Sequence, residues 1–243
     1  GDRVELLSHL LKENNIGNIV NVGASFRGCK DSLKLAESYE NVYAAIGIHP
    51  EEIDDASDEV LEWLRENASN PKVVAIGEIG LDYYWVKDPE GRAKQRIWFD
   101  KQMDLAKEVN LPVVIHSREA AEDTFNTIKS YNTQDVKGIV HCYSYSKELA
   151  LEYVKMGEYI GVGGVVTFKN GKKLVETVEA IPLENIVLET DCTYMAPEPH
   201  RGSRNSSIYL KYVSEKIAQL KGVSVEEVER ITYENALRIY SKC

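Results

Sequence analysis

Short apolar runs rich in β-branched residues alternate with longer amphipathic stretches along the whole of this 243-residue chain. Each run is nearly continuous and is bounded by turn residues, which is typical of parallel strands buried on both faces. The runs predict seven strands: Asn18–Ala24, Val42–His49, Val73–Leu81, Pro112–Ser117, Gly138–Ser144, Tyr159–Gly164 and Asn185–Asp191. The intervals between them show helical periodicity, as at Phe99, Met103 and Ala106. This alternation indicates an α/β protein with a parallel sheet.

The length and the alternation together predict one (β/α)₈ barrel of the TIM type, a fold that typically takes about 250 residues. No linker, low-complexity segment or change in composition divides the sequence, so residues 1–243 are expected to form a single domain. A helical pattern precedes the first predicted strand, with an apolar face formed by Leu6, Leu7, Leu10 and Leu11. Because a closed parallel barrel needs a strand before each helix, the first strand is expected to be missing from this sequence. An open seven-stranded sheet is the alternative.

Composition and charge narrow the class of protein further. The net charge of −10 excludes a broad basic surface of the kind that nucleic-acid binders carry, but it allows a small basic rim around a site. No apolar run reaches the roughly 18 residues of a membrane span, and the N-terminus shows no signal-peptide pattern. The cysteines, at positions 29, 142, 192 and 243, are scattered along the chain, which is typical of reduced thiols rather than of a disulfide framework. We therefore expect a cytoplasmic protein with no membrane partner and no obligate protein partner.

Histidines and carboxylates gather where the predicted strands end, which is the edge where barrels of this type place their active sites. The set consists of His49, Glu78, Asp82, His116, His141 and Asp191. Any one of the histidines could be an ordinary core or rim residue. A carboxylate inside the apolar run Val73–Ile79 is costly unless a cation or a strong donor compensates it. Imidazole and carboxylate together suit Zn²⁺, Mn²⁺ and similar ions, so the set predicts a divalent metal site.

Several segments of the chain, taken in order, resemble the TatD family of deoxyribonucleases. They are Val74–Tyr84 (VAIGEIGLDYY), Leu111–Arg118 (LPVVIHSR), His141–Ser144 (HCYS), Leu188–Asp191 (LETD) with the following Pro197, Arg201-Gly202 and Arg204-Asn205, and the closing Thr232–Ala236 (TYENA). The resemblance spans essentially the whole sequence, and the first of these segments is its most specific signature.

The resemblance implies a hydrolase that cleaves DNA phosphodiester bonds with two divalent metal ions, of Mg, Mn or Zn. It implies that Glu78 bridges the two ions and that His116 and His141 complete the more exposed one. It further implies that Asp191 binds the more buried ion and acts as the catalytic base. Rim positions that it places near the substrate are His49, Asp82, Arg118, Arg201 and Arg204.

A narrow barrel mouth favours a single-stranded DNA end, and hence an exonuclease. The aromatic residues Tyr83, Tyr84 and Trp85 could stack bases there, or could simply pack the loop after the third predicted strand.

One segment of the family pattern is absent from this sequence. The first strand of family members supplies an Asp-x-His-x-His segment, two of whose histidines bind the buried metal, and no such segment occurs here. His9 is not a substitute, because it lies within a helical pattern.

Because this segment is absent, two other functions stay open. One is a metal-dependent amide or ester hydrolase of small molecules on the same barrel, which the acidic charge favours. The other is a catalytically silent binding protein, if the first strand is truly absent.

Overall fold

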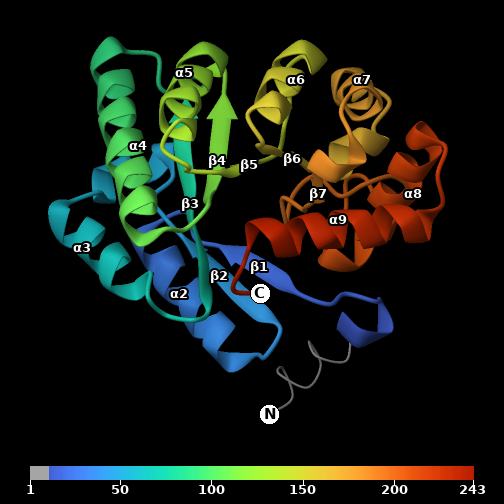
Figure 1. Ribbon diagram of the computed structural model, residues 1–243, viewed down its shortest axis with the longest axis horizontal. Coiled ribbons are helices and arrows are strands. Elements are labelled where there is room, and N and C mark those ends of the chain that lie inside the picture. The colour runs from blue at the N-terminus through green and yellow to red at the C-terminus, as the bar shows by residue number, and fades with distance from the viewer. Residues whose placement is uncertain (1–10) are drawn as a thin grey trace. The chain divides into compact units, whose positions relative to one another are not determined.

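The computed structural model describes residues 11–243, which fall into two compact units (Figure 1). Unit 1 comprises the chain up to Gly138 together with Tyr240–Cys243, and unit 2 comprises Ile139–Ile239. Residues 11–243 contain seven strands, one at each predicted place. No described helix is long and apolar enough to cross a membrane. His9 and most of the predicted first helix, with Leu6, Leu7 and Leu10, lie outside the described residues.

Unit 1 is a parallel sheet whose strand order follows the chain order. Its strands are β1 (Ile19–Val22), β2 (Val42–Ile46), β3 (Val73–Asp82) and β4 (Val113–Arg118). Its helices are α2 (Phe26–Ser38), the 3-10 helix η1 (Pro50–Asp55), α3 (Asp58–Asn67), α4 (Pro89–Val109) and α5 (Ala121–Asn132). Helix α4 packs along β3 and α5 packs beside β4 (Figure 1).

Unit 2 repeats the alternation of parallel strands and helices. Its strands are β5 (Gly138–Val140), β6 (Tyr159–Val162) and β7 (Ile186–Leu188). Its helices are α6 (Lys147–Lys155), η2 (Gly164–Thr167), α7 (Lys172–Ala180), η3 (Leu183–Asn185), η4 (Ser207–Tyr209), α8 (Leu210–Lys221) and α9 (Val225–Ile239). The buried Asn235 of α9 donates to the carbonyl oxygens of Leu183 and Ile186, which fixes this helix against the start of β7.

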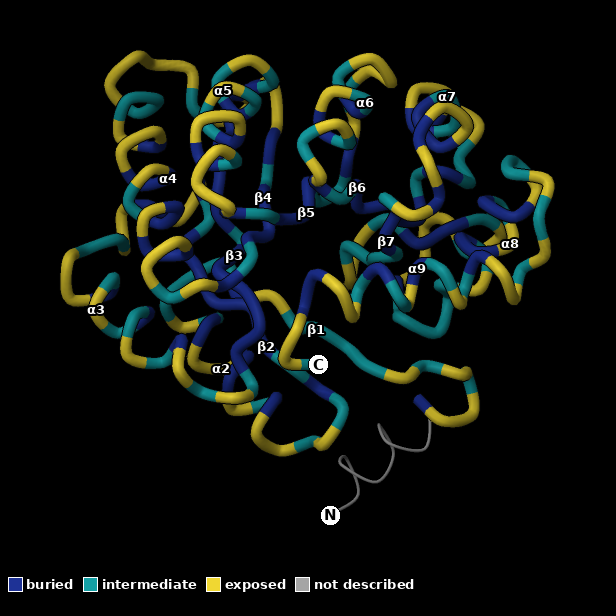
Figure 2. Tube along the Cα trace, viewed as in Figure 1, coloured by how far each residue is buried: buried dark blue, intermediate teal, exposed yellow. Residues whose placement is uncertain are grey.

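Strand β3 forms the core of unit 1. All of its residues are buried except Glu78, so most of the strand is dark blue in Figure 2. Its approach to β4 is close enough to require glycine. Gly80 has a φ of +139°, and a Cβ at this residue would lie 2.0 Å from the carbonyl oxygen of His116. The close approach brings the residues at the ends of β3 and β4 next to one another.

Five strands, β1, β2, β5, β6 and β7, end two to four residues earlier than the sequence predicts, and local features explain two of these ends. Strand β2 stops at Ile46, and His49 instead caps η1, where its Nδ1 accepts a hydrogen bond from the N–H of Glu51 at 3.1 Å. Proline has no N–H to donate to a strand ladder but suits the first position of a helix, so Pro50 favours this change. Strand β5 stops at Val140, because Cys142 takes a positive φ of 45° that ends the extended backbone.

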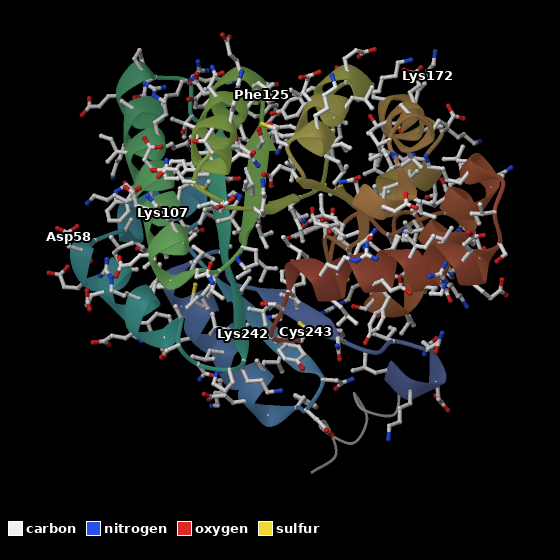
Figure 3. The ribbon with its side chains drawn as sticks, in the orientation of Figure 1. Asp58, Lys107, Phe125, Lys172, Lys242 and Cys243 are labelled. Atoms are coloured by element: carbon white, nitrogen blue, oxygen red, sulfur yellow. The ribbon has the colours of Figure 1, made fainter. Side chains whose placement is uncertain are left out.

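Basic side chains satisfy carbonyl groups where the strands of unit 1 begin. Lys242, labelled in Figure 3, donates to the carbonyl oxygens of Ala68 and Val73, both at 3.0 Å. Lys72 donates to the carbonyl oxygen of Val42 at 3.2 Å. Burial lowers the pKa of the Lys242 ammonium. These contacts lie at the ends of β2 and β3 that carry none of the predicted site residues.

Two buried glutamines of α4 are hydrogen-bonded to the backbone near the carboxyl ends of β2 and β3. Gln102 accepts a hydrogen bond from the N–H of Ile48 at 2.7 Å and donates to the carbonyl oxygen of the same residue at 3.1 Å. Gln95 accepts from the N–H of Asp82 at 2.9 Å and donates to the carbonyl oxygen of Pro50 at 3.1 Å. The two glutamines are seven residues apart and share a helix face. They therefore fix the backbone on both sides of His49 and at Asp82.

Replacing Gln102 with leucine is expected to lower the free energy of unfolding by roughly 2–4 kcal/mol, because the buried N–H and C=O of Ile48 would both lose their partner. Chemical denaturation of the wild type and the variant measures this loss. Gln134→Leu is the matched control, since Gln134 is exposed and its replacement should cost less than about 0.5 kcal/mol. Equal midpoints for the two variants would contradict the role given to Gln102.

Candidate metal centre

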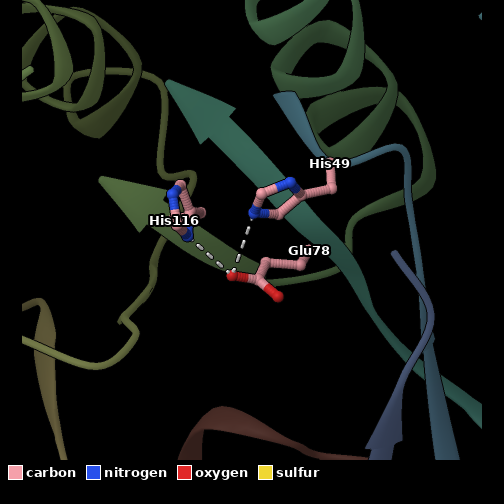
Figure 4. A group of neighbouring side chains, drawn as sticks. All are labelled: His49, Glu78 and His116. Atoms are coloured by element: carbon pink, nitrogen blue, oxygen red, sulfur yellow. Dashed lines mark hydrogen bonds and ion pairs between the residues drawn. The ribbon is translucent and has the colours of Figure 1, made fainter. Parts of the chain in front are cut away.

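Three predicted site residues of unit 1 lie together at the ends of the strands. Oε1 of Glu78 is 3.1 Å from Nδ1 of His116 and 3.7 Å from Nε2 of His49 (Figure 4). The side chains of His49, Glu78 and His116 are only 12%, 16% and 19% exposed. Each offers one candidate ligand atom, and these atoms all lie within 4.8 Å of one another. Glu78 is additionally held through its backbone N–H, which donates to the carbonyl oxygen of Gly23 at 3.0 Å.

The donor set of this cluster fits a divalent cation. A carboxylate that is largely removed from water needs compensation by positive charge or by strong donors. Here the imidazoles of His49 and His116 lie beside the Glu78 carboxylate, and imidazole is a group that commonly binds metal in proteins. Nitrogen and oxygen donors of this mix are those that Zn²⁺ and Mn²⁺ accept.

Asp82 holds His116 from behind the cluster. Its Oδ2 lies 3.0 Å from Nε2 of His116, and its Oδ1 accepts from the N–H groups of Tyr84 and Trp85, both at 2.9 Å. The sequence placed Asp82 at the rim, in contact with substrate. The structure instead buries it completely, with both oxygens bonded to the protein. The carboxylate is buried because the turn after β3 folds back over it, and in this position it orients His116, while its contact with substrate stays a prediction.

The neighbouring side chains of this cluster shift the pKa values of His116 and Asp82. Burial lowers the pKa of His116, but its hydrogen bonds with Asp82 and Glu78 and their negative charges outweigh burial and raise it from 6.5 to about 9. Burial raises the pKa of Asp82, but hydrogen bonds from His116 and Trp85 outweigh it and hold that pKa below 3.8. The two carboxylates therefore favour a cation at this position, whether a proton on the imidazole or a metal. With Nε2–H donated to Asp82, Nδ1 of His116 is the nitrogen left to bind metal.

Unit 2 contains a similar pair of residues. His141 follows β5 and its Nδ1 is hydrogen-bonded to Oε2 of Glu189, while Oε1 of Glu189 accepts from the N–H of Cys142 at 2.9 Å. Gly161 leaves room for this carboxylate, since a Cβ there would lie 2.5 Å from Oε2. Glu189 thus orients His141 as Asp82 orients His116.

Sequence reasoning missed the role of Glu189. One signal could have found it, because residues two apart on a strand point to the same face, and Glu189 precedes the predicted ligand Asp191 by two residues. Asp191 itself lies beyond the end of β7 and is half-buried.

The predicted substrate-binding arginines are exposed in both units. In unit 1 the guanidinium of Arg118 lies over the ring of Tyr84, with Cζ 3.9 Å from the ring centroid. In unit 2 that of Arg201 lies 4.2 Å from the ring centroid of Phe168. Arg204 follows in the same loop. The contacts of these arginines leave their role with substrate a prediction.

Comparison with known proteins agrees with this geometry. Residues 1–241 match the sequence profile of a family described as TatD related DNase. The uncharacterized metal-dependent hydrolase YabD of Bacillus subtilis is 45% identical over 229 residues, which cover 94% of this chain and 89% of that protein. The uncharacterized metal-dependent hydrolase YcfH of Escherichia coli K12 is 37% identical over 85% of this chain and 76% of its own length. The crystal structure of YjjV, a TatD homologue from Escherichia coli, has a TM-score of 0.89 at 30% identity and covers 96% of this chain and 90% of that one.

The fold and the cluster at the strand ends therefore define a metal-dependent hydrolase with an α/β fold of the TIM-barrel type. The chain belongs to the TatD family. Both the predicted fold class and the predicted family are confirmed.

Replacing Asp82 with asparagine is expected to weaken the binding of Mn²⁺ about 10- to 100-fold without unfolding the protein. The asparagine oxygen can still accept from Tyr84 and Trp85, but its amide nitrogen cannot accept from Nε2–H of His116. Glu189→Gln should act in the same way on His141. Isothermal titration calorimetry measures the affinities.

Asp54→Asn is the control for this experiment, because the side chain of Asp54 is 96% exposed and pairs only with Lys94 in the contacts described for it. Affinity of the Asp82 and Glu189 variants equal to that of this control would show that neither carboxylate positions a ligand.

Proposed function

We propose that this protein is a divalent-metal-dependent deoxyribonuclease that removes nucleotides from single-stranded DNA ends. The observation that carries the proposal is the partly buried carboxylate of Glu78 between two imidazoles, in a chain of the TatD family. The net charge of −10 does not oppose it, because the cations that matter are local: Arg118 lies two residues after His116, on the same strand end.

We assign the binding of two divalent ions, Mg²⁺, Mn²⁺ or Zn²⁺, to Glu78, His116, His141 and Asp191. His49 is a further candidate ligand, because its Nε2 faces Glu78. Bound divalent ions lower the pKa of water and offset the negative charge of a phosphodiester. Asp82 and Glu189 contribute indirectly, since they fix the tautomer and orientation of His116 and His141.

The remaining residues would accept the proton of the attacking water and bind the phosphate group. Asp191 would act as the general base and accept the proton of the water that attacks phosphorus. The bond between phosphorus and the leaving oxygen then breaks, and the leaving oxygen takes up a proton from solvent. Arg118, Arg201 and Arg204 offer N–H donors to the phosphate oxygens, on which negative charge grows during this step.

A nuclease assay on single-stranded DNA with Mg²⁺ or Mn²⁺ tests the proposal. Glu78→Gln keeps the size of the side chain but removes its charge, so nucleotide release should fall at least about 100-fold. A chelator should abolish release by the wild type. Glu66→Gln removes an exposed carboxylate of α3 and should leave the rate unchanged.

The outcomes also separate the two alternatives. Cleavage of small esters or amides that is sensitive to Glu78→Gln, without release of nucleotides, would replace the nuclease with a small-molecule hydrolase. Neither activity, in a protein that binds no metal, would identify a silent binding protein.

A further inference from the structure

An exposed group of two aromatic rings and one cation borders the candidate metal centre in unit 1. Tyr84 and Trp85, in the turn after β3, are 38% and 60% exposed, and their ring centroids lie 4.8 Å apart at an interplanar angle of 85°. Cζ of Arg118 lies 3.9 Å from the centroid of Tyr84 and 5.8 Å from that of Trp85. We call these three residues the aromatic platform.

The platform presents two kinds of recognition surface. Within residues 11–243 the guanidinium of Arg118 makes no hydrogen bond or ion pair, and its described contacts are the two ring faces. Its N–H donors are therefore available to an anion, and phosphate, like carboxylate, is an anion that a guanidinium binds with two parallel hydrogen bonds. The exposed indole of Trp85 offers a face for stacking. An aromatic face beside an anion-binding guanidinium matches the base and the phosphate of a nucleotide.

The platform is rigidly joined to the metal centre. Asp82 accepts from the N–H groups of Tyr84 and Trp85 with one oxygen and bonds His116 with the other. Asp82 pairs with Arg118 in the register of β3 and β4, and the N–H of Tyr83 donates to the carbonyl oxygen of Arg118 at 2.8 Å. One buried carboxylate thus fixes the position of the platform relative to a candidate metal ligand.

We propose that the aromatic platform is a subsite for one unpaired nucleobase and its phosphate, and that it selects single-stranded over double-stranded DNA. The placement of this subsite next to the reacting phosphate rests on the proposed nuclease function. Stacking needs a base face that is not covered by its neighbours; a single-stranded end offers such faces, whereas the paired bases inside a duplex are stacked on both sides. Lys87, 5.2 Å from the ring of Tyr84, adds a second cation at the edge of the platform.

Binding of a short fluorescein-labelled oligothymidylate, followed by fluorescence anisotropy in the presence of a chelator, tests the subsite without cleavage. Trp85→Ala should weaken binding about 10-fold or more, because stacking of a base on an aromatic ring is lost. Trp85→Phe, which keeps an aromatic face, should restore most of the affinity. Ile97→Ala is the control, since Ile97 is an apolar residue of α4 with a similar exposure of 57%. A duplex that contains the same oligothymidylate should bind the wild type more weakly than the single strand does, and Trp85→Ala should change its affinity little.

The results separate this inference from the proposed function. Weakened binding in Trp85→Ala together with no DNA hydrolysis by the wild type would support the subsite and overturn the nuclease. DNA hydrolysis together with equal affinities of Trp85→Ala and the wild type would overturn the subsite alone. Absence of any binding of single-stranded DNA by the wild type would also overturn the subsite.

Discussion

The buried carboxylate of Asp82 is the interaction on which the candidate site depends most. Removing an ionised carboxylate from water is costly, and here three hydrogen bonds offset that cost. One comes from the imidazole of His116 on β4 and two come from the backbone of the turn after β3. Gln95 of α4 fixes the backbone N–H of Asp82 as well. The end of β3, the end of β4, the turn and the long helix are therefore held to one another at a single residue, directly behind the Glu78 cluster.

The same arrangement occurs independently in each unit. His116 is bonded to Asp82 in unit 1, and His141 is bonded to Glu189 in unit 2. A carboxylate on one imidazole nitrogen fixes which nitrogen keeps its lone pair, and it also increases the basicity of the ring. Glycine makes each pairing possible: Gly80 allows β3 to approach β4, and Gly161 leaves space for the carboxylate of Glu189. The geometry thus fixes the orientation of the two imidazoles that we propose as metal ligands, in a chain of the TatD family of metal-dependent hydrolases.

Much of this could be predicted from the sequence, because buried parallel strands appear as nearly continuous apolar runs and their ends carry the polar residues of the site. That reasoning located all seven strands and the Glu78 and His116 pair. It could not locate the roles of Asp82, Glu189, Gln95 and Gln102, because each depends on a contact between residues far apart in the chain. His116 and Asp82 are 34 positions apart, and His141 and Glu189 are 48. Five strands end earlier than predicted, and two of these ends, those of β2 and β5, are decided locally by a cap at His49 and a positive φ at Cys142.

We expect the Glu78 cluster to bind a divalent ion through nitrogen and oxygen atoms that the fold already holds in place. Anomalous X-ray diffraction from crystals of the full chain grown with Mn²⁺ or Zn²⁺ tests it most directly. We expect an anomalous peak about 2.0–2.2 Å from a carboxylate oxygen of Glu78 and from Nδ1 of His116, with Asp82 still bonded to Nε2. A peak elsewhere, with Glu78 still paired to the histidines as in Figure 4, would contradict it.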